Sequence, residues 1–277
     1  MNSLINIYHK IGLDNRIIGI FKNEIISPYT YNLNTINQFT STFPPFFIPL
    51  FLDGDDPSYI GIIYHPFSER GMVFVKYDIS AGYMWEIARN SNQLLTGFLI
   101  NSIVNNDDEI DPDIKDFAAK INIEIDKIFL QTYEDLFDGS AFRSFRYFNI
   151  FSSETPAAYV QNLKSYDGDF PSIKSELNIN SLNYSSDFEI HETVDLINVK
   201  KPLPWSKKNK VEVFNEFINN GDLNNAWLTL NCKGWQIKDV IKGLVLLNTK
   251  TKDELFHLVA NNWIEGMQKA NKTEEYY

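Results

Sequence analysis

The stretch from Phe46 to Ile103 constrains the fold of this chain most. An apolar run from Phe43 to Leu52 meets the acidic turn Asp53-Gly-Asp-Asp-Pro57. Two segments rich in β-branched and aromatic residues follow, Tyr59 to Tyr64 and Met72 to Tyr77, with Pro and Gly between them. Such segments favour strands, and the intervening residues favour a turn. The pattern predicts an antiparallel strand pair.

Further elements on both sides of this pair predict the fold class. We expect a third strand at Tyr83 to Ile87, and a helix capped by Ser91 whose apolar residues recur every three or four positions. Asp111-Pro112 predicts a second helix, running to about Phe137. The isoleucine-rich Arg16 to Ile26 predicts a buried strand or strand pair. The sequence thus predicts an α+β fold in which an antiparallel-rich central sheet has flanking helices.

The C-terminal part predicts helices alone. Candidate caps are Ser206, Asp222 and Thr251, with Gly221 and Gly234 where helices would end. We expect four helices with short connections, which make antiparallel neighbours. They cover Lys207 to Asn220, Leu223 to Cys232, Gln236 to Asn248, and Lys252 to Lys269.

The amino-acid composition changes along the chain, and this change predicts where the chain divides into domains. All the arginines lie before residue 150, and the passage from Ser165 to Asp187 is rich in Ser, Asp and Pro. We expect an α+β domain over residues 1–150 and a helical C-terminal region over 205–277. Between them, 151–204 would be a polar connecting region with a short helix starting at Thr155-Pro156.

The charge of the chain bears on its partners and location. The net charge is −11 and the calculated pI is 4.9. Nucleic-acid phosphates and anionic membranes would be repelled by such a surface, so we expect no binding to either and favour a basic protein partner. Cys232 is the sole cysteine, and the N-terminus lacks the pattern of a secretory signal. Both features favour the cytoplasm.

Residues for catalysis or metal binding do not form a known pattern. The four histidines are spread along the chain, outside any ligand spacing. Gly54 and Pro57 break the resemblance of the turn after Asp53 to a calcium loop. There is no nucleophile elbow and no phosphate-binding glycine loop. We therefore predict a protein without catalytic activity, cofactor or metal, with an unrecognised hydrolase as one alternative.

Asp107 to Asp113 is the most acidic stretch and allows two interpretations. Five of its seven residues are carboxylates. It could simply be a solvated helix N-terminus, where negative charge is favoured. It could also be a docking surface that attracts a cationic partner.

One part of the chain resembles a known family. The segments are Ile48-Pro-Leu-Phe-Leu-Asp-Gly-Asp-Asp56, Tyr59-Ile-Gly-Ile-Ile-Tyr64, Gly71-Met-Val-Phe-Val-Lys-Tyr-Asp78 and Asn92-Gln-Leu-Leu-Thr-Gly-Phe-Leu99. Their order is similar to that of the SUKH superfamily, over about residues 46–103. The superfamily's usual opening helix is not visible in residues 1–45.

The resemblance implies that residues 1–150 form a SUKH-like domain that binds other proteins. Bacterial members are mostly immunity proteins that neutralise a secreted toxin, and fungal relatives act as signalling scaffolds. We expect a toxin-binding immunity protein, with a scaffold or adaptor as the alternative; the sequence leaves its oligomeric state open. The predicted partner-binding residues are all acidic: Asp53, Asp55, Asp56, Asp107, Asp108, Glu109, Asp111 and Asp113.

Overall fold

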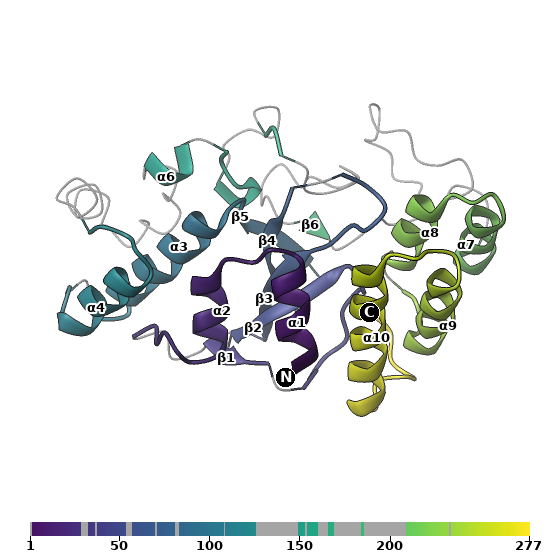
Figure 1. Cartoon of the computed structure of the whole chain (residues 1–277), viewed down its shortest axis with the longest axis horizontal. Coiled ribbons are helices and arrows are strands. Elements are labelled where there is room, and N and C mark those ends of the chain that lie inside the picture. The colour runs from purple at the N-terminus through teal and green to yellow at the C-terminus, as the bar shows by residue number, and fades with distance from the viewer. Residues whose placement is uncertain are drawn as a thin grey trace.

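The computed structural model describes most of the chain and places a sheet at its centre (Figure 1). The described residues are 2–28, 33–36, 38–53, 57–69, 71–80, 83–107, 109–125, 149–152, 154–159, 166–168, 184–185, 209–232 and 234–277. Within them, no helix is long and apolar enough to cross a membrane.

Six strands form an antiparallel sheet in the order in which they occur in the chain. The four longer strands are in the middle, and a short strand lies at each edge. The predicted antiparallel sheet is therefore confirmed. The strands are β1 (Leu33–Thr35), β2 (Phe47–Asp53), β3 (Ser58–Ile63), β4 (Val73–Asp78), β5 (Tyr83–Ala88) and β6 (Tyr184–Ser185).

Strand β2 contains a proline although it lies inside the sheet. Proline cannot donate to a strand ladder, so it is tolerated only at edges and bulges. Pro49 lies where the register between β2 and β3 shifts, and β1 pairs only with the later residues of β2, from Phe51 onward. The Pro49 carbonyl accepts a hydrogen bond from the Tyr8 hydroxyl at 2.6 Å. The bulge therefore accommodates the proline, and the N-terminal helix is attached to it.

Helices from the first part of the chain cover one face of the sheet. In the view of Figure 1, α1 and α2 lie in front of the strands, and α3 and α4 lie side by side to the left. The bounds are α1 (Asn2–Lys10), α2 (Asn15–Phe21), α3 (Ser91–Val104), α4 (Pro112–Lys120), α6 (Asn149–Ser152) and the 3-10 helix η2 (Ala157–Tyr159).

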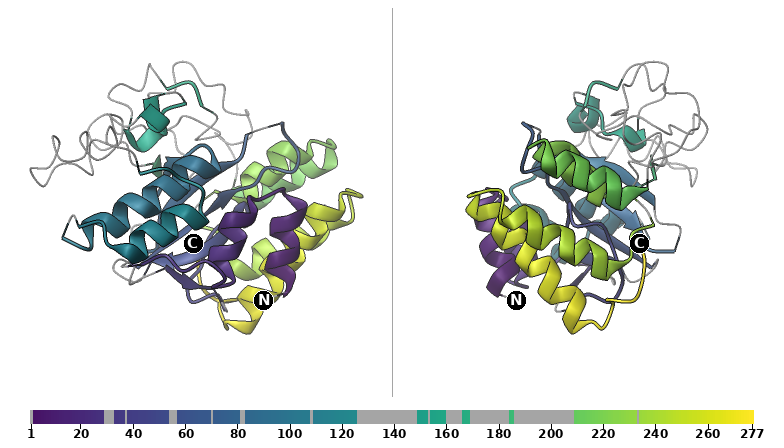
Figure 2. Two further views of the ribbon diagram at one scale, coloured as in Figure 1. Left: turned by 60° about the vertical axis from the view of Figure 1, so that its left-hand side comes forward. Right: turned by 90° about the vertical axis from the view of Figure 1, so that its right-hand side faces the viewer.

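The C-terminal helices gather beside the sheet, as both views of Figure 2 show. The predicted C-terminal helical region is thus confirmed. Asp222 is an N-cap as predicted, and Gly221 and Gly234 have positive φ. Asn209 caps α7 and Asp253 caps α10, where the sequence predicted Ser206 and Thr251; Ser206 lies outside the described residues. The bounds are α7 (Lys210–Asn219), α8 (Leu223–Leu230), α9 (Ile237–Asn248) and α10 (Glu254–Lys269).

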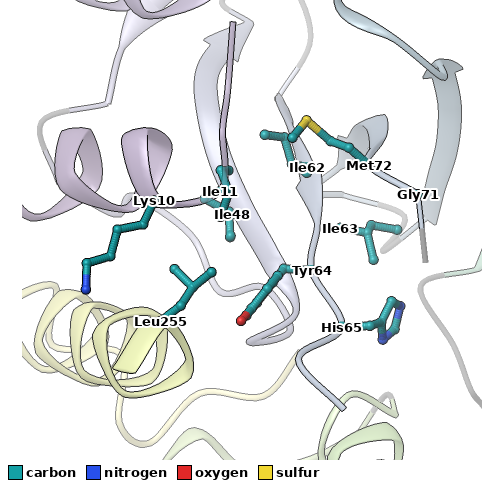
Figure 3. Close-up of a pocket in the computed structure, with 10 residues that line it drawn as sticks. All are labelled: Lys10, Ile11, Ile48, Ile62, Ile63, Tyr64, His65, Gly71, Met72 and Leu255. Carbon is teal, nitrogen blue, oxygen red and sulfur yellow. The ribbon is translucent and has the colours of Figure 1, made fainter. Parts of the chain in front are cut away.

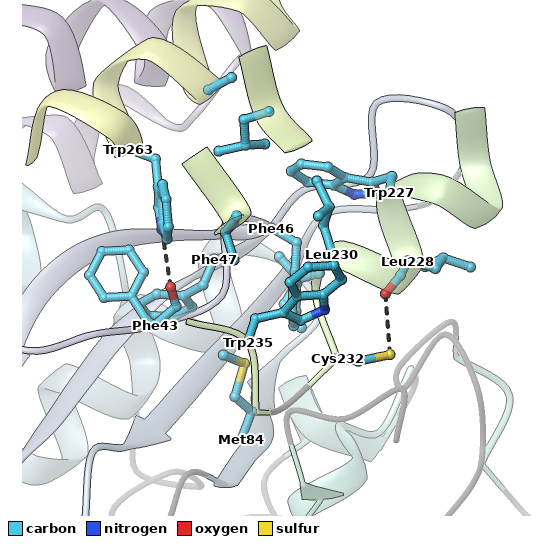
Figure 4. Close-up of a cluster of buried hydrophobic side chains, with 14 of the residues drawn as sticks. Phe43, Phe46, Phe47, Met84, Trp227, Leu228, Leu230, Cys232, Trp235 and Trp263 are labelled. Carbon is cyan, nitrogen blue, oxygen red and sulfur yellow. Dashed lines mark hydrogen bonds between the residues drawn. The ribbon is translucent and has the colours of Figure 1, made fainter. Parts of the chain in front are cut away.

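Alternation along the strands sends side chains into two separate cores. In β3, Tyr59 and Ile63 join a core shared with the C-terminal helices, whereas Ile60 and Ile62 join a core shared with α1–α4. Every residue of β3 is buried, which explains its uninterrupted apolar sequence. The first core is rich in aromatic rings (Figure 4). We call it the aromatic core and the second the aliphatic core.

The irregular segment before β2 is hydrogen-bonded to the C-terminal helices. The Trp263 indole N–H donates to the Phe43 carbonyl at 3.0 Å, and the Asn231 side-chain oxygen accepts from the Phe46 N–H at 2.7 Å (Figure 4 shows the first). A buried irregular backbone has no ladder partners and needs such bonds. Residues more than 180 positions apart in sequence therefore complete each other's hydrogen bonding. The domain boundaries remain a prediction.

Three local predictions were wrong. The supposed strand at Arg16 to Ile26 is largely helix α2, and α1 precedes it, so residues 1–45 do contain opening helices. Five of the seven residues of α2 are buried, so its sequence shows no amphipathic period. Helix α4 ends at Lys120 and not near Phe137, because Asn122 takes a left-handed conformation with φ of 53°.

Two helix starts also differ from expectation. Asn90, not Ser91, caps α3, accepting a hydrogen bond from the Gln93 N–H. After Thr155-Pro156 the described residues form the single-turn η2, and Thr155 donates its hydroxyl to the Phe151 carbonyl at 2.9 Å and does not cap η2.

Candidate functional site

The acidic turn between α3 and α4 has a defined backbone. It begins after Asn105, the C-cap of α3. The Asn106 N–H donates to the Ile103 carbonyl at 3.1 Å, and the Glu109 N–H donates to the Asn106 carbonyl at 2.9 Å. The Asn106 side-chain amide donates back to the Glu109 carbonyl at 2.9 Å. Asp107 takes a positive φ of 52°, which Asp tolerates better than most residues.

Asp111 has a structural role at the end of this turn. Its carboxylate oxygen accepts a hydrogen bond from the Ile114 N–H at 2.9 Å, and Pro112 occupies the first turn of α4. This is the predicted N-cap, and it satisfies a helix N–H that would otherwise lack a partner. Asp111 therefore sets the direction of α4, and it is half-buried.

Three further carboxylates at this turn, those of Asp107, Glu109 and Asp113, are exposed. Asp107, Glu109 and Asp113 form no ion pair with any residue that the structure describes. One turn further along α4, Asp116 is paired with Lys120 at 2.7 Å. We call Asp107, Glu109 and Asp113 the acidic triad. Its charge is not neutralised within the described chain, so it projects a negative potential into solvent.

Arg16 holds the supporting helices in position. Its guanidinium donates to the Ile121 carbonyl at the end of α4 at 2.6 Å and to the Asn92 side chain in α3 at 2.7 Å. It is also paired with the Asp14 carboxylate at 2.6 Å. The hydrogen bond and charge of Arg16 lower the pKa of Asp14 and outweigh the opposing effect of burial. One side chain thus connects α2, the start of α3 and the end of α4, at the end of this helix pair that is away from the acidic turn.

The second predicted acidic group is only partly described. Asp53 is the last residue of β2 and aligns with Leu33 on one side and Ser58 on the other. Asp55 and Asp56 lie outside the described residues, as does Asp108. The side chain of Asp53 likewise lies outside the described structure. The structure therefore groups Asp107, Glu109, Asp111 and Asp113 in one turn and leaves the joint surface with Asp53 as a prediction.

A pocket of about 320 Å³ lies between the ends of α1 and β3 and the start of α10 (Figure 3). Its walls are mostly aliphatic, including Ile48, Ile62 and Leu255, and its polar groups are Lys10, Tyr64 and His65. Its size is at the lower end for ligand pockets.

The polar groups of this pocket already have neighbours. Lys10 is paired with Glu254 at 3.2 Å, and the His65 ring stacks on Phe46 with 5.8 Å between centroids. Burial, and to a lesser extent the Asp253 carboxylate, raises the pKa of Tyr64 well above its usual value. A tyrosine so disfavoured as an anion makes a poor general base at neutral pH. No cluster of three metal-ligating side chains occurs among the residues that the structure describes.

Sequence reasoning missed a buried carboxylate in the sheet. Glu86 in β5 is fully buried, and its Oε2 accepts a hydrogen bond from the Ala157 N–H at 2.6 Å. Burial raises the pKa of Glu86 to about 7, against the opposing effects of the Ala157 N–H, Tyr166 and Arg89. One signal was available, because Glu86 is two residues beyond the buried Met84 and two-residue spacing points both side chains to one face.

Comparison of the chain with models of known protein families, with curated proteins and with solved structures found no match. Arguments about function therefore depend on the residues and geometry of this chain. Among the described residues, the acidic triad and the pocket beside Tyr64 are candidate sites.

Proposed function

We propose that the chain is an immunity protein of the SUKH type, which binds a cationic bacterial toxin in the cytoplasm and neutralises it without catalysing a reaction. The observation that carries this proposal is the acidic triad. Asp107, Glu109 and Asp113 are exposed, and none is ion-paired within the described chain. A basic toxin surface would supply the missing countercharges.

The shape of the acidic turn supports a docking role. The turn is fixed by its own backbone hydrogen bonds and by the Asp111 cap. Binding by a fixed surface requires less loss of conformational entropy than binding by a flexible one. Complementary charge also speeds the encounter and disfavours wrong partners. A solvated helix N-terminus explains Asp111 as the cap and Asp113 in the first turn, but it does not explain Asp107 and Glu109.

The order of elements also supports the family proposal. The segment starting at Ile48 lies in β2, Tyr59 to Ile63 in β3 and Val73 to Asp78 in β4, and Asn92 to Leu99 lies in α3. This is the order that the resemblance implies. The net charge of −11 favours a basic protein over nucleic acid as partner.

Growth protection tests this function directly. The protein would be co-expressed with the cationic toxin-like product of a neighbouring gene, and cell growth measured. Native protein should restore growth. The triad variant Asp107→Asn/Glu109→Gln/Asp113→Asn should protect poorly. The control variant Asp239→Asn/Glu265→Gln/Glu275→Gln removes the same number of charges from ion pairs beyond residue 209, and should protect like the native protein.

Each outcome decides between the alternatives. Equal protection by native and triad variants would show that docking does not use the acidic triad. Stable binding without protection would favour a scaffold or adaptor. A neighbourhood that encodes no basic protein would count against immunity altogether.

A further inference from the structure

The pocket beside Tyr64 is lined by apolar side chains from three parts of the chain (Figure 3). On the sheet side the lining is buried and comes from Ile48 in β2 and from Ile62 and Ile63 in β3. The rest of the apolar lining is half-buried and lies just after α1, just before β4 and in the first turn of α10: Ile11, Met72 and Leu255. Contact with an apolar molecule would remove these half-buried side chains from water. The lining therefore favours a ligand with an aliphatic body.

The volume of the pocket limits the size of that body. A cavity of roughly 150 Å³ with an apolar lining holds one benzene molecule. The pocket beside Tyr64 measures about 320 Å³. It therefore has room for roughly twice as many non-hydrogen atoms, about twelve in all. A medium-length carbon chain with a small polar group at one end is of this size.

The Tyr64 hydroxyl can direct such a ligand. In Figure 3 the Tyr64 ring extends toward the side of the pocket on which Leu255 lies. The described part of the chain offers the hydroxyl no hydrogen-bond partner. Burial, and to a lesser extent the Asp253 carboxylate, raises the pKa of Tyr64, so the hydroxyl keeps its proton and can donate it in a hydrogen bond. An oxygen atom on the ligand would complement this donor.

The charges beside the pocket are already matched. Lys10 is paired with Glu254 at 3.2 Å. At the start of α10, the Asp253 carboxylate accepts hydrogen bonds from the Leu255 and Phe256 N–H groups at 2.9 and 3.1 Å. An ionised ligand would thus leave water without gaining a free countercharge, and an anion would also face these two carboxylates. An uncharged ligand avoids both costs.

We propose that this pocket binds an uncharged aliphatic molecule of medium chain length, whose chain contacts the isoleucine lining and whose terminal oxygen accepts a hydrogen bond from the Tyr64 hydroxyl. The inference does not depend on the proposed immunity function, because the pocket and the acidic triad consist of different residues. A bound ligand would contact Ile11 after α1 and Leu255 in α10 together, and would stabilise the packing of these two helices.

A series of small ligands tests the chemical class. Methyl hexyl ketone would be titrated into the full chain, and binding followed through the methyl NMR signals of Ile62 and Ile63. Methyl butyl ketone, which is two methylene groups shorter, should bind about 15-fold more weakly, since each buried methylene contributes about fourfold. Octanoate and octylammonium carry a similar chain with a charged head and should bind at least about tenfold more weakly than methyl hexyl ketone. An octanoate affinity equal to that of the ketone would overturn the uncharged class.

Tyr64→Phe separates the hydrogen bond from the apolar contacts. Because the ring is kept, this variant should fold like the native protein. Its affinity for methyl hexyl ketone should fall about three- to tenfold, whereas its affinity for cyclohexane, which has no acceptor, should stay unchanged. An unchanged affinity for the ketone, or an equal loss for both ligands, would contradict the role of Tyr64.

Filling the pocket provides a second test. Leu255→Trp places a larger side chain in the lining and should abolish binding of both the ketone and cyclohexane. Leu258→Trp, at another half-buried position of α10 outside the lining, is the matched control and should bind like the native protein. Native protein whose Ile62 and Ile63 signals do not shift at the solubility limit of the ketone would refute the proposal whether or not these variants fold.

Discussion

The two cores of this protein are built differently on opposite faces of one sheet. The aliphatic core consists largely of Ile, Leu and Phe from α1–α4 and the strands. The aromatic core joins the strands to α7–α10 and contains three buried tryptophans, Trp227, Trp235 and Trp263. Two side chains on the same face of the sheet also form hydrogen bonds with the buried segment before β2. Trp263 donates one of these bonds, and Asn231 accepts the other.

This difference between the two cores indicates which substitutions should affect folding stability and which should affect binding. Polar groups on the aromatic side fix one arrangement, because a shifted helix would leave buried backbone groups unsatisfied. Apart from the Tyr8–Pro49 hydrogen bond, the aliphatic side depends mainly on volume. The acidic triad lies on this side, at the turn between α3 and α4. We therefore expect substitutions in the aromatic core to affect folding, and substitutions in the triad to affect binding.

Removing Trp263 should have the largest effect. Trp263→Ala leaves a large cavity and an unpaired Phe43 carbonyl, and should lower the free energy of unfolding by about 3–5 kcal/mol. Denaturant titration would measure this change. Val245→Ala, at a position 52% exposed, is the control and should change stability by less than about 0.5 kcal/mol. Equal effects of both changes would refute the role of the aromatic core.

Asn231 tests the hydrogen bonds of the same core without a large loss of volume. Asn231→Ala leaves the Phe46 N–H and the Trp227 carbonyl without their side-chain partner. The cost should be about 1–3 kcal/mol for the buried N–H, measured by the same titration. A change no larger than that of Val245→Ala would show that these bonds contribute little.

Asp111 connects folding with the acidic turn. Asp111→Ala removes the N-cap of α4 and should lower the free energy of unfolding by about 1 kcal/mol. Asp111→Asn keeps a capping oxygen and should recover most of this loss. If both variants were equally destabilised, the effect would come from the charge and not from the cap.

Ile100 tests the aliphatic core with a small change. Ile100 is 1% exposed, and Ile100→Val deletes one methylene without disturbing any side-chain hydrogen bond. We expect a loss of about 0.5–1.5 kcal/mol on thermal or denaturant unfolding. A cost above that of Asn231→Ala would contradict the contrast between the two cores.

The sequence predicted the middle of the sheet and the C-terminal helices because their signals are local. β-Branched and aromatic residues, with turn residues between them, define β3 and β4, and Asp222 caps α8 as a nearby side chain. Helix α2 was missed because Ile17, Ile18 and Ile20 are all buried, which removes the amphipathic period. Asp14, its N-cap, was the signal that could have found it.

Long-range pairings were beyond prediction from a single sequence. No local sequence pattern indicates that Asn231 contacts Phe46 or that Arg16 contacts Ile121, because the residues of each pair lie far apart in the chain. The candidate site was predictable to the extent that it is one acidic segment. The Asp111 cap was predicted from the Pro112 that follows it, whereas the structure was needed to show that Asp107, Glu109 and Asp113 form no ion pair within the described chain.

The salt dependence of binding tests the central claim most directly. Affinity for the purified toxin would be measured while the Debye length shortens from about 30 Å at 0.01 M salt to about 3 Å at 1 M. Native protein and the Asp239→Asn/Glu265→Gln/Glu275→Gln control should lose affinity steeply with salt, whereas the Asp107→Asn/Glu109→Gln/Asp113→Asn variant should bind more weakly and respond less. Identical salt dependence for all three proteins would contradict docking through the acidic triad.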